Sequence, residues 1–206
     1  MLRVVVALLV VVVVVGAGGC QVVGRPDAEG RVSSSETPPT ATASAPASVS
    51  ASLSAQEQAL RDAALSTPKP ERPAGMDELS PEGLRLAGEY FMSLYPYVYA
   101  TGDLSGWQAM IDPECGFCDS VITKVTKLHD AGGWVDPTPH EAVAVSYGAS
   151  EEDPNVWVVT FHYSHPESLD HDGSGGTSSV KAEDVTFALQ MRWTGQTWVT
   201  EKGQAR

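Results

Sequence analysis

The spacing of large apolar residues changes at Trp134, and this change constrains the fold more than any other feature of the 206-residue chain. Before Trp134, apolar residues recur at intervals of three and four, the spacing of a helix that buries one face. After Trp134 they alternate with smaller or polar residues, as in half-buried strands. Helices followed by strands predict an α+β domain in which N-terminal helices pack on one face of a curved antiparallel sheet.

The first predicted helix begins at Ser80, because a capping serine, Pro81 and an acidic first turn occur together there. Its apolar face is expected to contain Leu84, Ala87, Phe91, Leu94, Tyr95 and Val98. Proline lacks a backbone N–H, so we expect Pro96 to kink or end this helix. Gly102 is the expected stop, and Asp103 is the expected cap of a short second helix.

A third helix is predicted to start at Asp112-Pro113-Glu114 and to close at Gly132-Gly133, with a Cys-x-x-Cys sequence near its start. Cys115 and Cys118 are an even pair once Cys20 is set aside, so we predict that they form a disulfide. Closing so short a ring contributes about 2 kcal/mol, and a structural staple is the favoured interpretation. A thiol–disulfide oxidoreductase is the alternative, since a helix start lowers the pKa of a thiol, although the redox fold places this motif after a parallel strand.

Antiparallel strands are expected after the helices. Their alternating large residues are Val143, Val145 and Tyr147, then Trp157, Val159, Phe161 and Tyr163, then Val185, Phe187, Leu189, Met191 and Trp193. We expect these large residues to form the core face that meets the helices. A tight turn at Thr194-Gly195-Gln196 leads into Trp198, and Ser164–Ser179 is predicted to be a long loop rich in Gly and Ser.

We expect three parts along the chain: a signal peptide (1–19), a disordered linker that begins at Cys20 (20–75), and a single domain (76–206). Ser33–Ala55 is almost entirely Ser, Thr, Ala and Pro, so few of its side chains repay the entropy cost of ordering. A helix over Leu53–Leu65 is expected to be only transient.

The charge of the chain lies in its C-terminal part. Residues 76–206 hold twenty acidic and seven basic side chains, a difference equal to the formal net charge of −13 for the whole chain. Such a domain is repelled by phosphate backbones, so we expect no binding to nucleic acid.

The N-terminus resembles a bacterial lipoprotein signal. Arg3 precedes a wholly apolar run, Val4–Val15, and the small residues Gly16–Gly19 lie directly before Cys20. The resemblance implies cleavage before Cys20 and attachment of a diacylglyceryl group to its thiol. Two acyl chains anchor a protein durably, so the expected location is extracytoplasmic, at the surface of the cell membrane.

Three motifs in the domain resemble an uncharacterised family of actinobacterial lipoproteins. They are Tyr97–Asp103, Asp112–Cys118 and the closing hairpin Trp193–Trp198. In that family a lipid anchor and a low-complexity linker precede one domain with the cone-shaped fold of nuclear transport factor and of SnoaL-like polyketide cyclases. The resemblance implies this fold, but the family has no known activity to transfer.

Cone-shaped folds of this kind often enclose a pocket between helix and sheet. The candidate lining residues are Tyr90, Tyr95, Tyr99, Trp107, His162, Gln190 and Arg192. A purely structural core is the favoured interpretation of the aromatic members. We find no strand position at which an acid is expected to point inward, so no catalytic residue is assigned.

A sequence cluster of five potential metal ligands is also interpreted as structural: His162, His165, Asp170, His171 and Asp172. Residues three apart on a strand point to opposite faces, which separates His162 from His165. The other three fall in the predicted loop, and we expect no metal ion and no cofactor.

The expected function is therefore that of a non-enzymatic binding module of the cell envelope. Its partner is either another envelope protein or a small apolar ligand, and the membrane is contacted through the lipid anchor. The alternative from another class is a small cyclase or isomerase with its pocket between helix and sheet, which would need a carboxylate or histidine in apolar surroundings.

Overall fold

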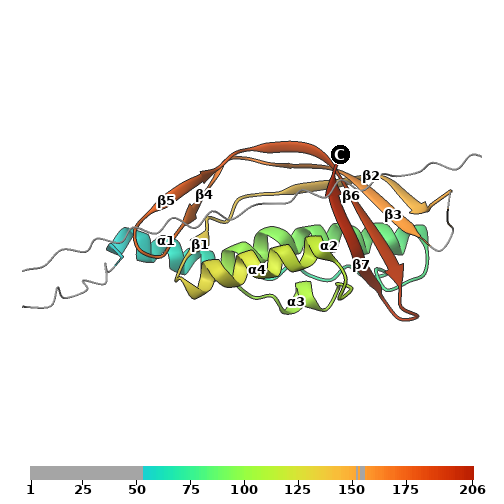
Figure 1. The fold of residues 1–206 in the computed structure, drawn as a ribbon, viewed down its shortest axis with the longest axis horizontal. Helices are drawn as coiled ribbons and strands as arrows, with labels where there is room; N and C mark the ends of the chain where they lie inside the picture. Colours follow the sequence, from blue (N-terminus) through green and yellow to red (C-terminus); the bar gives the residue numbers. More distant parts are fainter. Residues whose placement is uncertain (1–52, 152, 154–155) are drawn as a thin grey trace, which may run out of the picture. The chain divides into compact units, whose positions relative to one another are not determined.

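The computed structural model describes residues 53–151, 153 and 156–206. The elements in this part of the chain, drawn in Figure 1, are α1 Ala55–Leu65, α2 Pro81–Thr101, α3 Ser105–Gln108, α4 Gly116–Asp130, β1 Trp134–Val135, β2 Glu141–Ala149, β3 Trp157–His165, β4 Ser168–His171, β5 Thr177–Val180, β6 Glu183–Trp193 and β7 Trp198–Ala205. The predicted signal peptide, Cys20 and most of the predicted linker lie outside the described residues. None of the helices in the described ranges is long and apolar enough to span a bilayer.

The strands form two antiparallel sheets. The larger is four-stranded with the order β2-β3-β6-β7, and the smaller is three-stranded with the order β1-β4-β5. The long helices α2 and α4 lie along one side of the strands, which arch over them in Figure 1. The predicted α+β class, with helices packed on a curved antiparallel sheet, is confirmed.

Helix α2 is bounded as its sequence predicts. The Ser80 hydroxyl accepts a hydrogen bond from the Gly83 N–H (3.0 Å), and Gly102 ends the helix with φ 76°, a left-handed conformation suited to glycine. The expectation that Pro96 would interrupt the helix is wrong with respect to its end, because α2 continues to Thr101. A proline inside a helix costs about 3 kcal/mol, and burying Leu94 and Val98, each fully buried, offsets it at about 1.5–3 kcal/mol per side chain.

Helix α2 approaches strand β3 closely at Gly88. A Cβ atom at this position would lie 2.7 Å from Val159 Cγ1 and 2.9 Å from Phe161 Cζ. Both contacts are shorter than real Cβ atoms show, so only glycine lets α2 approach β3 this closely. The core next to it contains the inward-facing residues of β3 and β6, Val159, Phe161, Tyr163, Leu189 and Met191, as the alternation predicts.

Strand β2 presents the opposite face from the one predicted. Val143 and Val145 are 57% and 61% exposed, whereas Ala142 and Ala144 pack against the core. Both alternating sets in β2 are apolar, so the period of two cannot assign the inner face, and the larger residues were wrongly placed inside. Small alanines on the inner face suit a strand against which α2 packs directly.

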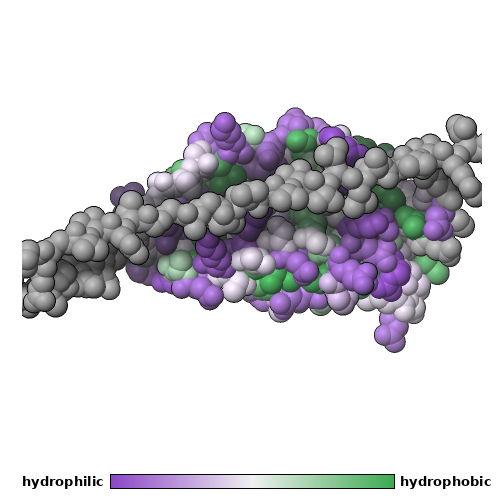
Figure 2. Space-filling model, in the orientation of Figure 1, coloured by the Kyte–Doolittle hydropathy of each residue, from purple (hydrophilic) through white to green (hydrophobic). Residues whose placement is uncertain are grey.

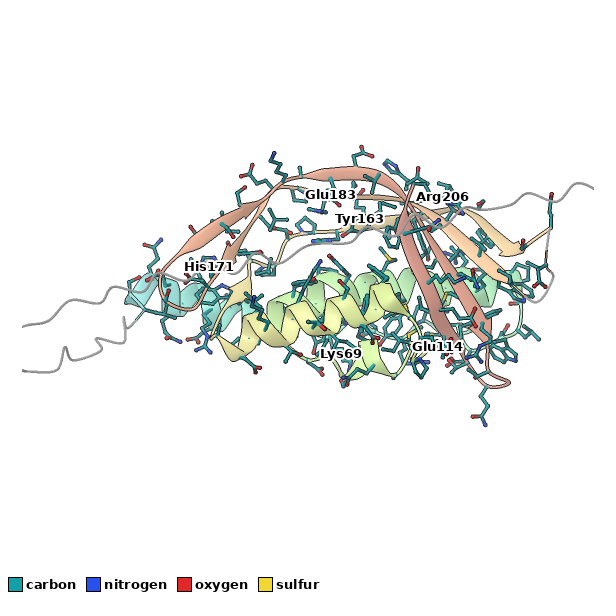
Figure 3. All side chains as sticks on the ribbon, viewed as in Figure 1. Lys69, Glu114, Tyr163, His171, Glu183 and Arg206 are labelled. Atoms are coloured by element: carbon teal, nitrogen blue, oxygen red, sulfur yellow. A yellow bond between two sulfur atoms is a disulfide. The ribbon has the colours of Figure 1, made fainter. Side chains whose placement is uncertain are left out.

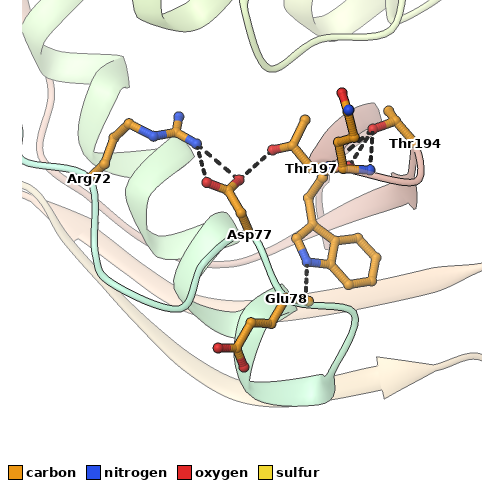
Figure 4. A network of polar contacts seen from close by, with 7 residues as sticks. Arg72, Asp77, Glu78, Thr194 and Thr197 are labelled. Atoms are coloured by element: carbon orange, nitrogen blue, oxygen red, sulfur yellow. Dashed lines mark hydrogen bonds and ion pairs between the residues drawn. The ribbon is translucent and has the colours of Figure 1, made fainter.

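The domain includes residues before Met76. Helix α1 is formed, with a capping box between Ser54 and Glu57, and packs against α2 and β1, so the expectation of a transient helix is wrong. Further along, Arg72 pairs with both carboxylate oxygens of Asp77 (3.0 and 2.9 Å), and Asp77 accepts a hydrogen bond from Thr197 Oγ1 (2.6 Å; Figure 4). These contacts tie the segment to the β6–β7 turn.

The predicted Gly- and Ser-rich loop contains two strands. β4 and β5 pair with each other, and β4 pairs with β1 through Trp134↔His171 and Val135↔Asp170. The loop prediction failed because these strands are four residues long and rich in Ser, with little hydrophobic alternation. The strands extend the curved sheet beyond the end of α4.

Candidate functional site

A cavity of about 610 Å³ lies between α2, α4 and the two sheets. Its apolar wall contains Met92, Phe117, Leu128, Val135, Val180, Val185 and Phe187. Figure 3 shows Tyr163 and Glu183 on the strands above the helices and His171 toward the end that carries β1, β4 and β5. The space is large enough for a small organic molecule.

Three tyrosines from two elements bring hydroxyl groups to this cavity. Tyr95 and Tyr99 are one turn apart on α2, with ring centroids 5.0 Å apart, and Tyr163 comes from β3. Burial raises the pKa of all three phenols above the ordinary value near 10. All three therefore remain neutral at physiological pH and keep their O–H donors.

His140, in the segment before β2, contacts Tyr163. Its Nδ1 lies 2.6 Å from the Tyr163 hydroxyl and its Nε2 lies 3.3 Å from Thr138 Oγ1. Burial, and to a smaller extent His165 stacked at 4.7 Å, lower the pKa of His140 to about 4. The imidazole is thus neutral at pH 7, and because Tyr163 is protonated, its O–H donates to Nδ1 while Nε2–H faces Thr138.

Two carboxylates also line the cavity: Glu183, whose side chain is 58% exposed, and Asp170, which is partly buried and for which the expectation that no acid points inward is wrong. Glu183 Oε2 lies 3.8 Å from Nε2 of His165, which is a long ion-pair distance. Asp170 has a buried Oδ1 that makes no hydrogen bond within the described part of the chain. Burial raises the pKa of Asp170, and the nearby His171 partly opposes this effect. Asp170 was assigned to a flexible loop because the short strand β4 was not recognised.

Helix α4 contributes two lysines to the cavity edge. Lys124 and Lys127 are exposed, and no ion pair is found for either among the described residues. The face in Figure 2 is mainly hydrophilic, with smaller hydrophobic patches between the polar side chains. The cavity therefore combines an apolar wall with phenol, imidazole, carboxylate and ammonium groups.

Of the residues predicted to line a pocket, the structure places Tyr95 and Tyr99 in the cavity wall. Tyr90 is buried on another side of α2, where the Arg72 guanidinium lies 5.4 Å from its ring centroid. Trp107 is fully buried and stacks on a core phenylalanine at 4.1 Å. These two aromatics belong to the core, which was the favoured interpretation.

The other three predicted residues lie outside the cavity. His162 points to the exposed face of β3, as its spacing from His165 requires, and lies 3.5 Å from an Asp184 oxygen. Gln190 and Arg192 each donate a hydrogen bond to Glu201, at 2.9 and 2.8 Å. Gln190 and Arg192 were proposed as pocket residues, but their positions on β6 alternate with the inward-facing Leu189 and Met191.

Several cavity residues were missed by the sequence analysis, chiefly His140, Tyr163 as a polar group, and His165. The signal for His165 was present, because it continues the inward alternation of Phe161 and Tyr163 on β3. His140 gave no such signal, since it lies between β1 and β2 with no periodic neighbours.

The predicted disulfide between Cys115 and Cys118 is present, with a Cα–Cα distance of 5.2 Å. Cys115 caps α4, which starts at Gly116 and not at Asp112, because the Asp112 carboxylate instead accepts the Glu114 N–H (3.0 Å). Both cysteines have no exposed surface, so neither sulfur is accessible to a thiol substrate.

The structure does not bring the five potential metal ligands of the sequence into one group. No group of three or more candidate ligands is found in the described residues. His171 is buried, stacks on Trp134 at 4.2 Å and lies 3.0 Å from the Asp136 carboxylate. Asp172 accepts hydrogen bonds from Ser174 and Gly176 in the adjoining turn.

A family model matches residues 57–204, and its description is a family of unknown function, DUF6318. The chain belongs to this family. The predicted membership of an uncharacterised family is thereby confirmed, and the DUF6318 match includes α1 as well as the predicted domain. No curated protein matches the chain.

The solved structures that match part of this DUF6318 chain include the following three. The intermembrane-space region of the chloroplast protein ARC6 has 8% identity and a TM-score of 0.49, covering 62% of this chain and 97% of that one. An NTF2 variant with five substitutions has 10% identity and a TM-score of 0.35, covering 58% and 96%. The beta subunit of a protein assigned as an aromatic-ring-hydroxylating dioxygenase from Novosphingobium aromaticivorans has 14% identity and a TM-score of 0.40, covering 60% and 88%.

Proposed function

We propose that this protein is a lipid-anchored module of the cell envelope that binds a small, largely apolar ligand in the cavity between α2, α4 and the sheets. The observation that carries the binding role is the cavity itself. Its volume of about 610 Å³ falls within the range of about 300–1,000 Å³ typical of small-molecule sites. An apolar wall with a few convergent polar groups is also typical of such sites.

The polar groups fit binding better than acid–base turnover. Burial raises the pKa of the Tyr95, Tyr99 and Tyr163 hydroxyls, so they stay neutral. In this form each one can donate and accept hydrogen bonds. His140 has a pKa of about 4, too low for an efficient general base at neutral pH. These groups orient a ligand in the apolar space without changing their own protonation.

The binding role is tested with the full chain in dodecyl maltoside micelles and 2-naphthol, a fluorescent aromatic alcohol. Val185→Phe adds a ring at the cavity wall and should weaken binding of 2-naphthol at least tenfold. The matched control is Val143→Phe, which makes the same change on the exposed face of β2 and should bind as the wild type does. Equal binding by both variants, or no saturable binding above that of empty micelles, would refute the ligand-binding role.

The anchor is proposed from the sequence around Cys20. Its test is mass spectrometry of the native protein, which should begin at Cys20 with a diacylglyceryl group. Cys20→Ala should release the protein from the membrane fraction or leave the signal uncleaved. A native protein with an intact leader and a free thiol at this position would rule out the anchor.

A small isomerase or cyclase is the second candidate, and one observation favours it. Asp170 is a cavity carboxylate whose pKa is raised by burial, and tyrosine hydroxyls lie in the same wall. Proton transfer next to a carbonyl requires a carboxyl group with a raised pKa and a hydrogen-bond donor opposite it. Carbon-13 NMR titration of the Asp170 carboxyl tests this role, and a pKa at or below about 4, the ordinary range for Asp, would eliminate it.

A further inference from the structure

We infer that the cavity selects an organic cation, an alkylammonium group on an apolar body, held between the rings of Tyr95, Tyr99 and Tyr163 and the Asp170 carboxylate. This inference rests on the proposed ligand-binding function and names the chemical class of the ligand. Four kinds of observation bear on it: the ring faces, the carboxylate without a cation, the surrounding charge and the lysines at the cavity edge.

The tyrosine rings supply surfaces that attract positive charge. An ammonium group within about 6 Å of an aromatic ring centroid is attracted by the negative face of the ring, and the attraction increases when water is excluded. Tyr95 and Tyr99 have ring centroids 5.0 Å apart, and Tyr163 contributes a third ring to the same cavity wall. The rings of Tyr95 and Tyr99 are inclined to each other at 51°, so they are not stacked face to face.

Asp170 supplies a negative charge that the protein leaves without a cation. No ion pair of Asp170 is found among the described residues, and its buried Oδ1 makes no hydrogen bond there. The nearest basic group is the neighbouring His171, whose Nε2 already faces the Asp136 carboxylate at 3.0 Å. Burying a carboxylate without a partner is unfavourable, and a bound cation would compensate for this cost.

Acidic side chains outnumber lysines around the cavity. Glu183 also lines the cavity, and the fields of Asp170 and Glu183 contribute to the raised pKa values of the cavity tyrosines. The whole chain has a net charge of −13. A negative cleft in a negative protein attracts cations and repels anions at long range.

Lys124 and Lys127 are the observation that points the other way. Both are exposed on α4, where water screens their charge, whereas Asp170 is partly buried. Coulomb interactions scale inversely with the effective dielectric constant, which is about 80 in water and about 20 near a protein wall. Water therefore screens an ion pair with the partly buried Asp170 less than an ion pair with an exposed lysine at the same distance, and the cation is favoured.

The test uses three probes of similar shape on the full chain in dodecyl maltoside micelles. They are phenyltrimethylammonium, its neutral counterpart tert-butylbenzene, and the anion benzenesulfonate. We expect the cation to bind at least tenfold more tightly than the neutral probe, and benzenesulfonate to bind least. Asp170→Asn should weaken binding of the cation about tenfold and change that of the neutral probe less than twofold.

Two control comparisons separate a local effect from a change in net charge or in folding. Asp184→Asn removes the same charge from an exposed position on β6 outside the cavity wall and should leave all three affinities unchanged. Tyr99→Leu should weaken binding of the cation more than binding of the neutral probe. Tyr99→Phe keeps the aromatic ring and should leave the preference for the cation unchanged. Thermal melting of each variant identifies any that fails to fold.

The outcomes distinguish this inference from the proposed function. If the neutral probe binds as tightly as the cation, or if benzenesulfonate binds best, the cation preference is wrong while ligand binding stands. Unchanged cation affinity in Asp170→Asn would also overturn it. If none of the three probes binds to the folded chain, the proposed ligand-binding function fails as well.

Discussion

Replacing His140 with asparagine should remove part of the acid sensitivity of the domain's stability. In the unfolded chain the imidazole titrates near 6.5, whereas burial lowers the folded-state pKa to about 4. Between these values the unfolded chain binds a proton that the folded domain does not, so the free energy of unfolding falls as pH falls. The contribution of His140 is complete above about pH 6.5 and is lost progressively down to about pH 4.

The size of the effect follows from the two pKa values. One pH unit between them is worth about 1.4 kcal/mol, so the upper limit is about 3 kcal/mol. Because the imidazole is only partly buried, solvent screening reduces this limit, and we expect about 1–2 kcal/mol. Asparagine keeps an acceptor near the position of Nδ1, so the hydrogen bond from Tyr163 can persist while the titrating group is removed.

The measurement is urea unfolding followed by tryptophan fluorescence at pH 7 and at pH 4.5. Between these conditions the wild type should lose about 1–2 kcal/mol more stability than His140→Asn. Carboxylates titrate in both proteins and cancel in the difference. His162→Asn, which removes an imidazole from the exposed face of β3, is the control and should follow the wild type. Equal losses in wild type and His140→Asn, or a His140 ring proton that titrates near 6.5 by NMR, would refute the reasoning.

Three further predictions concern stability. Replacing both Cys115 and Cys118 with alanine should lower the free energy of unfolding by about 2 kcal/mol, because the short closed loop is lost. A change below about 0.5 kcal/mol, measured by urea unfolding, would contradict a stabilising role for the disulfide. Gly88→Ala should destabilise the domain by about 1–3 kcal/mol despite alanine's higher helix propensity, because its Cβ would meet Val159 at 2.7 Å; a raised melting temperature would show that α2 can move away. Asp170→Asn should raise the melting temperature at pH 7 and have little effect at pH 3, because the raised pKa of Asp170 means that the folded domain disfavours its charged form.

Much of the fold could be predicted because local signals and burial agree. The cap at Ser80 and the left-handed Gly102 bound α2 as their chemistry requires. The alternation on β3 and β6 also gives the correct inner face, because one set of residues is large and apolar and the other is not. Where both sets are apolar, as in β2, the face was assigned wrongly, since tertiary contact with α2 selects the smaller residues.

The cavity could not be predicted in the same way, because its wall is assembled from segments that are far apart in sequence. Tyr95 was found on a recognised helix face, and Tyr99 was found among the neighbouring aromatic residues proposed to line a pocket. Asp170 lies on the short strand β4, and His140 lies in an irregular segment. Neither segment has a periodic pattern in the sequence, so neither residue could be assigned to the cavity. Their roles arise from burial and neighbours, which only the assembled fold supplies.

Pro96 shows how a local exception and the site coincide. The sequence predicts an interruption of the helix, and the helix nevertheless continues, so the missing hydrogen bond is tolerated within α2. Because proline has no N–H, the carbonyl of Met92 loses the donor that residue 96 would otherwise provide. Met92 and Pro96 line the cavity on the same stretch of α2 as Tyr95 and Tyr99. The backbone hydrogen bond that α2 lacks therefore lies where the helix faces the cavity, which is what the proposed binding role would lead us to expect.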